Sequence, residues 1–301
     1  MAAITNANLA VLNTGFQTIF QNGLKSVEPQ YQQIATVVTS NTASNTYGWL
    51  GEMPELIEWV GKRTIKDITS HDYAIINKLF ESTIGVKRTD IEDDNLGIYN
   101  PLFSALGQRA AQHPDKLVFE LLKAGTSTLC YDKQNFFDTD HPVYPNHDGT
   151  GSPETVSNFD DGTGAAWYLL DTKQALKPLI FQIRKPVEMT AMMGNNDENV
   201  FTEDKYRWGV RARHNVGFGF WQMAHCSKQE LTEENLNAAI AKMQSRKADG
   251  GRLLDISPTL LVVPPSLRAT ALKLVKADTM ANGQTNINKD VVDVLSTSRV
   301  M

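Results

Sequence analysis

The chain has 301 residues, of which 41% are hydrophobic and 21% are charged, and its formal net charge is −5. That length suits about two domains, and the ordinary composition excludes a disordered, collagenous or coiled-coil protein. No apolar run approaches the roughly 18–20 residues that cross a bilayer, and the acidic balance argues against binding to nucleic acid through bulk charge. The sequence therefore predicts a globular protein with no membrane partner.

The first fifty residues carry only two charged side chains, Lys25 and Glu28. Large apolar side chains recur there at steps of three and four, which places them on one face of a helix. These side chains are Leu9, Leu12, Phe16, Ile19, Phe20 and Leu24. Two interpretations stay open: the helix packs on its own domain, or it is an arm that packs on a neighbouring subunit.

A short helix over residues 53–60 and a long β-hairpin are predicted next. Residues 63–69 form the first strand, residues 70–72 have turn chemistry, and residues 73–88 form the second strand. Charged side chains occupy many alternate positions of the hairpin, and an isolated two-stranded hairpin is only marginally stable in water. We therefore expect the hairpin to lie on a surface that the chain does not supply itself.

A long helix follows at residues 98–124. Pro114 lies inside it and predicts a break or kink, because proline has no N–H to donate to the helix ladder. Residues 132–164 are rich in Gly, Pro, Asn and Asp, which predicts loops. Strands are predicted at 167–170, 179–183, 185–193, 206–226, 258–265 and 290–295, and helices at 232–247 and 266–276.

Candidate chemistry is sparse. The sequence contains no GxGxxG, P-loop, GxSxG, HExxH or CxxC motif. Asp138, Asp140 and His141 are metal-ligand types, so a metal-dependent hydrolase is one alternative, although such a Pro- and Asn-rich segment favours turns. Arg211 and Arg213 share a strand face, either in salt bridges or in an inter-subunit patch. No cofactor and no metal are expected.

These parts, in this order, resemble the Hong Kong 97 phage-type capsid fold, and particular motifs resemble the Mu-like phage major head subunit family. The motifs are Tyr47-Gly48-Trp49-Leu50, Met53-Pro54-Glu55-Leu56, Glu58-Trp59-Val60-Gly61, Phe80-Glu81, Ile91-Glu92-Asp93-Asp94, Pro101-Leu102-Phe103, Asn135-Phe136-Phe137-Asp138-Thr139-Asp140-His141-Pro142-Val143, Gly209-Val210-Arg211-Ala212-Arg213, Gly217-Phe218-Gly219-Phe220-Trp221 and Pro258-Thr259-Leu260-Leu261-Val262-Val263-Pro264-Pro265. The resemblance covers nearly the whole chain, and the ordered set is specific although each motif alone is weak.

The resemblance implies an α+β fold with four named parts. These parts are the N-terminal arm at 1–50, the E-loop region at 51–93, the P-domain with its spine helix at 94–128 and strands at 181–228, and the A-domain at 129–180 and 229–301. It implies a non-enzymatic major capsid protein of a tailed double-stranded DNA phage or prophage, located in the virion capsid. The nearest alternative is an encapsulin, a shell of the same fold that holds a cargo enzyme.

The resemblance also implies partners. Copies of the chain would form hexamers and pentamers of an icosahedral shell, assembled in the bacterial host cytoplasm, that encloses DNA without reading its sequence. A separate scaffolding protein, a portal protein and possibly a decoration protein would take part. The residues expected at the assembly interface are Leu9, Leu12, Phe16, Phe20, Arg63, Lys66, His71, Tyr73, Ile75, Lys78, Arg88, Arg211 and Arg213.

Overall fold

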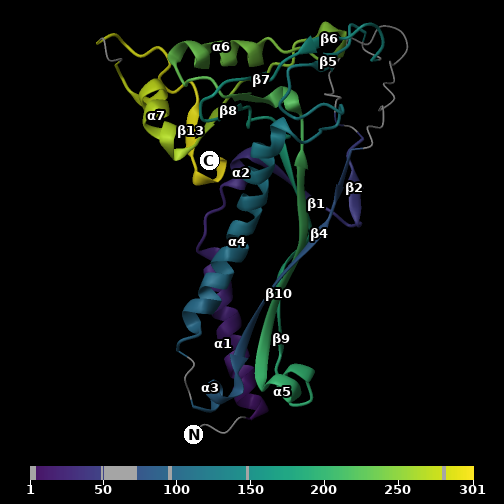
Figure 1. Ribbon diagram of the computed structural model, residues 1–301, viewed down its shortest axis with the longest axis vertical. Helices are drawn as coiled ribbons and strands as arrows, with labels where there is room; N and C mark the ends of the chain where they lie inside the picture. Colours follow the sequence, from purple (N-terminus) through teal and green to yellow (C-terminus); the bar gives the residue numbers. More distant parts are fainter. Residues whose placement is uncertain (1–4, 49, 51–72, 94–96, 147–148, 280–282) are drawn as a thin grey trace.

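The computed structural model describes residues 5–48, 50, 73–93, 97–146, 149–279 and 283–301. Figure 1 shows two bodies, a long rod and a wider globular end from which the rod extends. The C-terminus lies where the two bodies meet, and the first described helix begins at the far end of the rod. The predicted hairpin turn and its first strand, at residues 63–72, lie outside the described residues, as does the helix at 53–60.

Two long helices and a four-stranded sheet build the rod. The helices are α1 (Asn6–Lys25) and α4 (Asn100–Lys123), and the sheet order is β1-β9-β10-β4. Its strands are β1 (Ala35–Thr39), β4 (Lys78–Lys87), β9 (Leu179–Met192) and β10 (Lys205–Phe218). Short helices lie beside them: α2 (Tyr31–Ile34), α3 (Arg88–Glu92) and α5 (Glu198–Glu203).

Strand alternation decides which face of the rod sheet is buried. Along β10, Tyr206, Trp208, Val210 and Ala212 are buried, while Arg211 between them is exposed. Successive strand residues point to opposite faces, so one face packs on the helices and the other stays open. In Figure 1, α1 and α4 lie on one side of β9 and β10.

The predicted spine helix is confirmed, and it is not broken at Pro114. One α-helix runs from Asn100 to Lys123 and has Pro101 in its first turn, where the missing N–H has no helix partner to lose. Pro114 lies inside this helix and lacks the N–H that an interior residue donates. The continuous helix therefore carries one local weakness near its middle.

The helix α1 crosses α4 at two glycines. A Cβ on Gly107 would lie 2.2 Å from the Phe20 carbonyl oxygen, and a Cβ on Gly23 would lie 2.2 Å from the Ser104 carbonyl oxygen. No side chain larger than hydrogen fits at such a distance, so the two backbones approach closely only because both residues are glycine.

A five-stranded sheet forms the centre of the globular end, in the order β13-β12-β8-β11-β7. Its strands are β7 (Phe159–Asp160), β8 (Trp167–Leu170), β11 (Ala224–Ser227), β12 (Leu260–Val263) and β13 (Asp293–Ser296). Helices α6 (Glu233–Gln244) and α7 (Arg268–Lys276) cover this end, and two small ribbons pair β2 (Ser44–Thr46) with β3 (Ala74–Ile76) and β5 (His141–Val143) with β6 (Glu154–Val156).

The prediction of one strand over residues 206–226 is wrong, because the chain changes sheets inside that segment. The strand β10 ends at Phe218 in the rod, and β11 begins at Ala224 in the globular end. Gly219 lies in between and donates its N–H to the Pro178 carbonyl oxygen at 2.7 Å. A Cβ there would lie 2.7 Å from the Lys177 carbonyl oxygen, so only glycine allows this close approach.

Candidate functional site

The apolar stripe of α1 packs inside its own chain. Leu9, Phe16 and Phe20 are buried, and the Phe16 ring stacks on Phe103 of α4 with ring centroids 4.1 Å apart. Leu12 is half-buried against the same cluster. The apolar surface that the stripe covers is thus supplied by α4 and β10. Leu9, Phe16 and Phe20 leave little area for a neighbouring subunit, and the place of the half-buried Leu12 at an interface stays a prediction.

The hairpin residues divide in the same way. Arg63, Lys66 and His71 lie outside the described residues. Ile75 is buried, and the Tyr73 hydroxyl accepts a hydrogen bond from the Phe218 N–H at 2.7 Å. Burial raises the pKa of Tyr73 to about 12. Both side chains therefore contact the junction of rod and globular end. Ile75 leaves almost no surface for a partner, whereas Tyr73 is half-buried and its place at an assembly interface stays a prediction.

The strand β4 also finds its partner within the chain. It pairs antiparallel with β10 along its whole length, from Lys87 opposite Lys205 to Lys78 opposite His214. The expectation that this segment lacks an internal surface is therefore wrong for its second strand. That expectation came from the charged positions of the strand. Glu81 and Lys87 lie on the open face of the sheet, opposite to the face of the buried Ile84 and Val86.

Charged interface candidates remain at the surface. Lys78 is exposed, Arg88 begins α3 and pairs with Glu92 at 3.3 Å, and Arg213 is half-buried. Arg211 lies on the open face of the rod sheet, 3.8 Å from Glu188 of β9. A single exposed pair at that distance contributes little to folding, so Arg211 is free to contact a partner.

One group of described residues has the composition of a metal or acid–base site. The Cys130 thiol donates to Asp132 at 3.0 Å, and the same carboxylate lies 2.6 Å from Nδ1 of His141. The His141 ring is fully buried and stacks on Trp221 with centroids 4.0 Å apart. These ligand atoms all lie within 4.8 Å of one another. Sequence reasoning missed Asp132, because it precedes His141 by nine residues in a loop.

Electrostatics favours a closed hydrogen-bonded cluster at this place. Burial raises the pKa of the Cys130 thiol, so the thiol keeps its proton and donates it. Burial is the largest single effect on Asp132 and raises its pKa, but the hydrogen bonds from His141, Cys130 and the Gln134 N–H together with the His141 charge lower the net pKa. A protonated thiol is neither a nucleophile nor a metal ligand.

The hydrolase trio inferred from the sequence is not assembled. The Asp138 carboxylate accepts from the backbone N–H and side-chain amide of Asn135, at 3.2 and 3.0 Å. The Asp138 carboxylate accepts a hydrogen bond from the protonated carboxyl group of the exposed Asp140, and this bond raises the pKa of Asp140. His141 faces Asp132 instead of either acid. The two carboxylates therefore make the loop turns that their neighbours favour.

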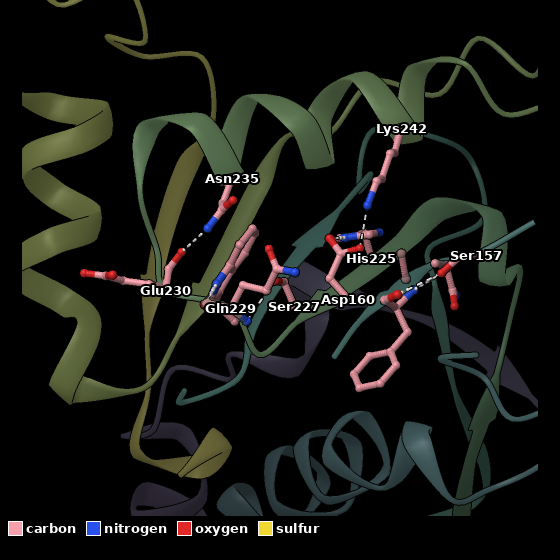
Figure 2. Close-up of polar contacts among 12 residues, drawn as sticks. Ser157, Asp160, His225, Ser227, Gln229, Glu230, Asn235 and Lys242 are labelled. Carbon is pink, nitrogen blue, oxygen red and sulfur yellow. Dashed lines mark hydrogen bonds and ion pairs between the residues drawn. The ribbon is translucent and has the colours of Figure 1, made fainter. Parts of the chain in front are cut away.

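Figure 2 shows a second polar cluster, in the globular end. The buried His225 of β11 lies 2.8 Å from the Asp160 carboxylate through Nε2 and 3.2 Å from the Arg246 guanidinium through Nδ1. Lys242 of α6 also contacts Asp160 at 2.5 Å. Burial raises the pKa of Asp160, but the hydrogen bonds from His225 and Lys242 prevail and lower it to about 2. The cluster ties α6 to the sheet edge.

A third cluster lies in the middle of the rod, between α4 and the sheet. His113 Nδ1 and His214 Nε2 are 2.9 Å apart, and the Phe80 ring packs against both imidazoles, with centroids 4.4 and 4.8 Å away. Burial, with His113 close by, lowers the pKa of His214 to about 4. A cavity of 230 Å³ opens beside this layer, bordered by Leu106, Ala110 and other apolar residues.

Comparison with known proteins places the whole chain in one group. The family described as Mu-like prophage major head subunit gpT matches residues 9–300. The major capsid protein of Escherichia phage Mu is 47% identical over 291 residues, which covers 96% of this chain and 95% of that protein.

Within the described residues, no helix is long and apolar enough to cross a membrane.

Solved structures agree with the sequence comparison. A chain from the procapsid of bacteriophage JBD30 is 56% identical and superimposes with a TM-score of 0.88, covering 98% of this chain and 100% of that one. A chain from the JBD30 capsid decorated with minor capsid protein trimers is 42% identical, with a TM-score of 0.77 over 99% of both chains. The fold is thus that of phage shell subunits.

Proposed function

Because this chain belongs to the family of Mu-like prophage major head subunits gpT, we propose that its copies form the hexamers and pentamers of a closed icosahedral shell. The chain is a major capsid protein, and its function is to self-associate into a phage head. The shell encloses double-stranded DNA without contacting particular bases, and the net charge of −5 keeps the subunit from adhering to the packaged phosphates.

The observation that carries this proposal is the extent of the match. The family covers residues 9–300, so both the rod and the globular end are shared with head subunits. The structure supports a building-block role further, because the Cys130, His141 and His225 groups are used in contacts within the chain. A closed symmetric shell repeats the same contacts many times, so no single interface has to be strong.

Other partners follow from the same role. A scaffolding protein guides the curvature of the growing shell, and a portal protein replaces one pentamer as the entry for DNA. The open face of the rod sheet is available to a decoration protein, since a JBD30 capsid carries trimers of a minor capsid protein. Assembly takes place in the cytoplasm of the bacterial host.

The test is the size of the purified protein, by light scattering and negative-stain microscopy, first alone and then with its scaffolding protein. Rings, tubes or closed shells are the expected result. A chain of 33.4 kDa that stays monomeric with scaffold present would contradict the proposal.

A deletion tests the role of the hairpin turn. Residues 62–72 would be replaced by a short Gly-Ser linker that keeps Tyr73, because Tyr73 bonds to Phe218. We expect a folded subunit with unchanged circular dichroism that does not form shells, because the hairpin reaches across to a neighbour. Shells of normal yield from this variant would show that the hairpin has no part in assembly.

The contents of the shells separate a phage head from a cargo shell. Shells recovered from infected or induced cells are expected to hold double-stranded DNA. A single co-purified enzyme without DNA would favour the encapsulin alternative. The hydrolase alternative would require a stoichiometric metal, and hydrolysis, that are both lost in Asp140→Ala. The hydrogen bonds of His141 to Asp132 and of Asp138 to Asn135 disfavour this alternative.

A further inference from the structure

A single aromatic side chain stands out at the far end of the rod. Phe201 of α5 is 87% exposed, the highest value among the exposed large hydrophobic residues described. Its immediate neighbour Val200 is buried, so Val200 anchors α5 to the rod while Phe201 is exposed to solvent. Figure 1 shows α5 beside the end of β9, away from the globular end.

The tip that carries Phe201 is firmly built. The buried Asn199 amide donates to the Met192 and Lys205 carbonyl oxygens, at 3.2 and 2.7 Å. Asp197 accepts the Gly194 N–H at 2.8 Å, and the left-handed Asp204 ends the helix. Phe201 is thus held in a defined position, so little conformational freedom remains to be lost when a partner covers it.

A site of matching size and polarity lies on the middle of the rod. The 230 Å³ cavity between α4 and the sheet is bordered by Phe80, Leu106, Ala110, Val187 and Val210. A cavity of about 150 Å³ lined by apolar side chains accepts a benzene ring, so this cavity has room for a phenylalanine side chain.

Charges on the two features are complementary. The tip carries Asp197, Glu198, Glu203 and Asp204, of which only Glu203 forms an ion pair among the described residues, with Arg207. Arg109, Arg211 and Glu81 lie at the rim of the cavity, and Arg211 also lies 3.8 Å from Glu188, so Arg109 is the rim cation that would meet the acidic tip. The Arg109 guanidinium contacts Gln112 at 3.3 Å and has no acidic partner in the described part of the chain.

Phe201 cannot enter the cavity of its own chain. The tip precedes Lys205, and the cavity lies beside Val210 and Ala212 of the same strand. At about 3.3 Å per residue, five to seven residues of extended strand separate the two by roughly 20 Å. If Phe201 fills a cavity of this kind, the cavity must therefore belong to a second copy of the chain.

We propose that Phe201 of one subunit inserts into the cavity between α4 and β10 of a neighbouring subunit, with its acidic tip against Arg109. The contact is heterologous, with the knob on one copy and the hole on the next, so it can close rings or link them. This inference rests on the proposed shell function and assigns one specific contact to it.

Photo-cross-linking tests the contact directly. The full-length chain would carry p-benzoylphenylalanine at position 201, be assembled with ¹⁵N-labelled wild-type chain, and be irradiated as shells. We expect mixed-isotope cross-links from position 201 to residues 80–82, 106–113 or 210–214. Cross-links that go only to α5 of other copies, or only to the globular end, would overturn the proposal. The same probe at Val11, which is 73% exposed, should not reach the cavity.

Substitutions give a second readout. Phe201→Ser should reduce the yield of shells at least tenfold, as expected for loss of an aromatic anchor, and should leave the melting temperature of the subunit unchanged. Ile287→Ser, at a residue 78% exposed in the globular end, is the matched control and should assemble normally. Equal yields from both variants would contradict the inference.

A charge exchange separates this contact from a general effect on assembly. Arg109→Glu and Glu198→Arg should each lower the yield, and the double variant should recover most of it, because the opposite charges face each other again. No recovery would argue against the pairing. Failure of the wild-type chain to form shells with scaffold would instead refute the proposed function and can be told apart from these outcomes.

Discussion

The rod and the globular end hold their buried histidines in opposite ways. His225 in the globular end lies between the Asp160 carboxylate and the Arg246 guanidinium, so both ring nitrogens have charged partners. His214 in the rod faces a second histidine, His113, and an aromatic ring. A buried histidine therefore has charged hydrogen-bond partners on both ring nitrogens in the globular end, which we call the saturated network. In the rod, a buried histidine has only another histidine and an aromatic ring beside it.

The surroundings of His214 in the rod are also packed less completely than those of His225 in the globular end. The rod layer lies next to a 230 Å³ cavity, near Pro114 of α4, and beside irregularities of the β9–β10 register at Arg211–His214. The globular end places side chains of two elements, His225 of β11 and Lys242 of α6, on one acid, Asp160. We infer that the globular end is the rigid body of the subunit and that the rod yields first in its middle.

The largest effect is expected from the saturated network. Arg246 is 3% exposed and donates to the Ala224 carbonyl oxygen at 2.9 Å and to His225. Arg246→Met should lower the free energy of unfolding by about 3–5 kcal/mol, because buried acceptors lose their donor. Urea denaturation followed by circular dichroism and by the fluorescence of the five tryptophans measures this change. Lys242→Met, at a half-exposed residue, is the control and should change stability by less than about 1 kcal/mol.

The rod should be most sensitive where its helices cross. Gly107→Ala places a methyl group 2.2 Å from the Phe20 carbonyl oxygen and should destabilise the rod by about 1–3 kcal/mol, loosening α1. Limited proteolysis would show faster cleavage after residue 25. Gly15→Ala is the control, since nothing lies within 4 Å of its added Cβ, and it should be neutral or slightly stabilising. Equal behaviour of the two variants would contradict the tight crossing.

Acid should separate the two bodies. The pKa of His214 is lowered from 6.5 to about 4, so the unfolded chain binds more protons, and this contribution to stability declines as pH falls from 6.5 to 4. In the globular end, burial also lowers the pKa of His225, but less than that of His214, so this end loses less stability below pH 6.5. The pKa of Asp160 is lowered from 3.8 to about 2, so its contribution is lost only below pH 3.8. Thermal melts between pH 7.5 and 3 should show loosening of the rod first. His214→Gln should flatten the change between pH 6.5 and 4.

The smallest effect on folding is expected on the open face of the rod sheet. Arg211→Ala should change the free energy of unfolding by less than about 1 kcal/mol, because its contact with Glu188 is exposed and 3.8 Å long. Calorimetry of the unassembled subunit measures this change. A decrease of more than about 2 kcal/mol in the free energy of unfolding would mean that Arg211 belongs to the core of the rod. The rod sheet would then not have one buried and one open face.

Local patterns in the sequence predicted the elements well. The stripe of α1, the long α4 and the alternation along β10 follow from steps of 3.6 and 2 residues, which any helix or strand shows without reference to the rest of the chain. The ordered motifs also indicated the family that the comparisons confirm. The sheet change at Gly219 was missed, because a run of aromatic and small residues reads as one strand until the approach of Pro178 is known.

What the sequence determined by itself was the set of amphipathic elements and their order, since backbone periodicity is a local property. Which surface each element covers was decided only by the tertiary structure. Phe16 meets Trp208 across 192 residues of chain, and His113 meets His214 across 101, with ring centroids 5.2 Å apart in the first pair. Contacts at such separations depend on how the whole chain folds back. Only the tertiary structure therefore shows that the apolar stripe of α1 is covered within the chain and that Phe201 stays exposed.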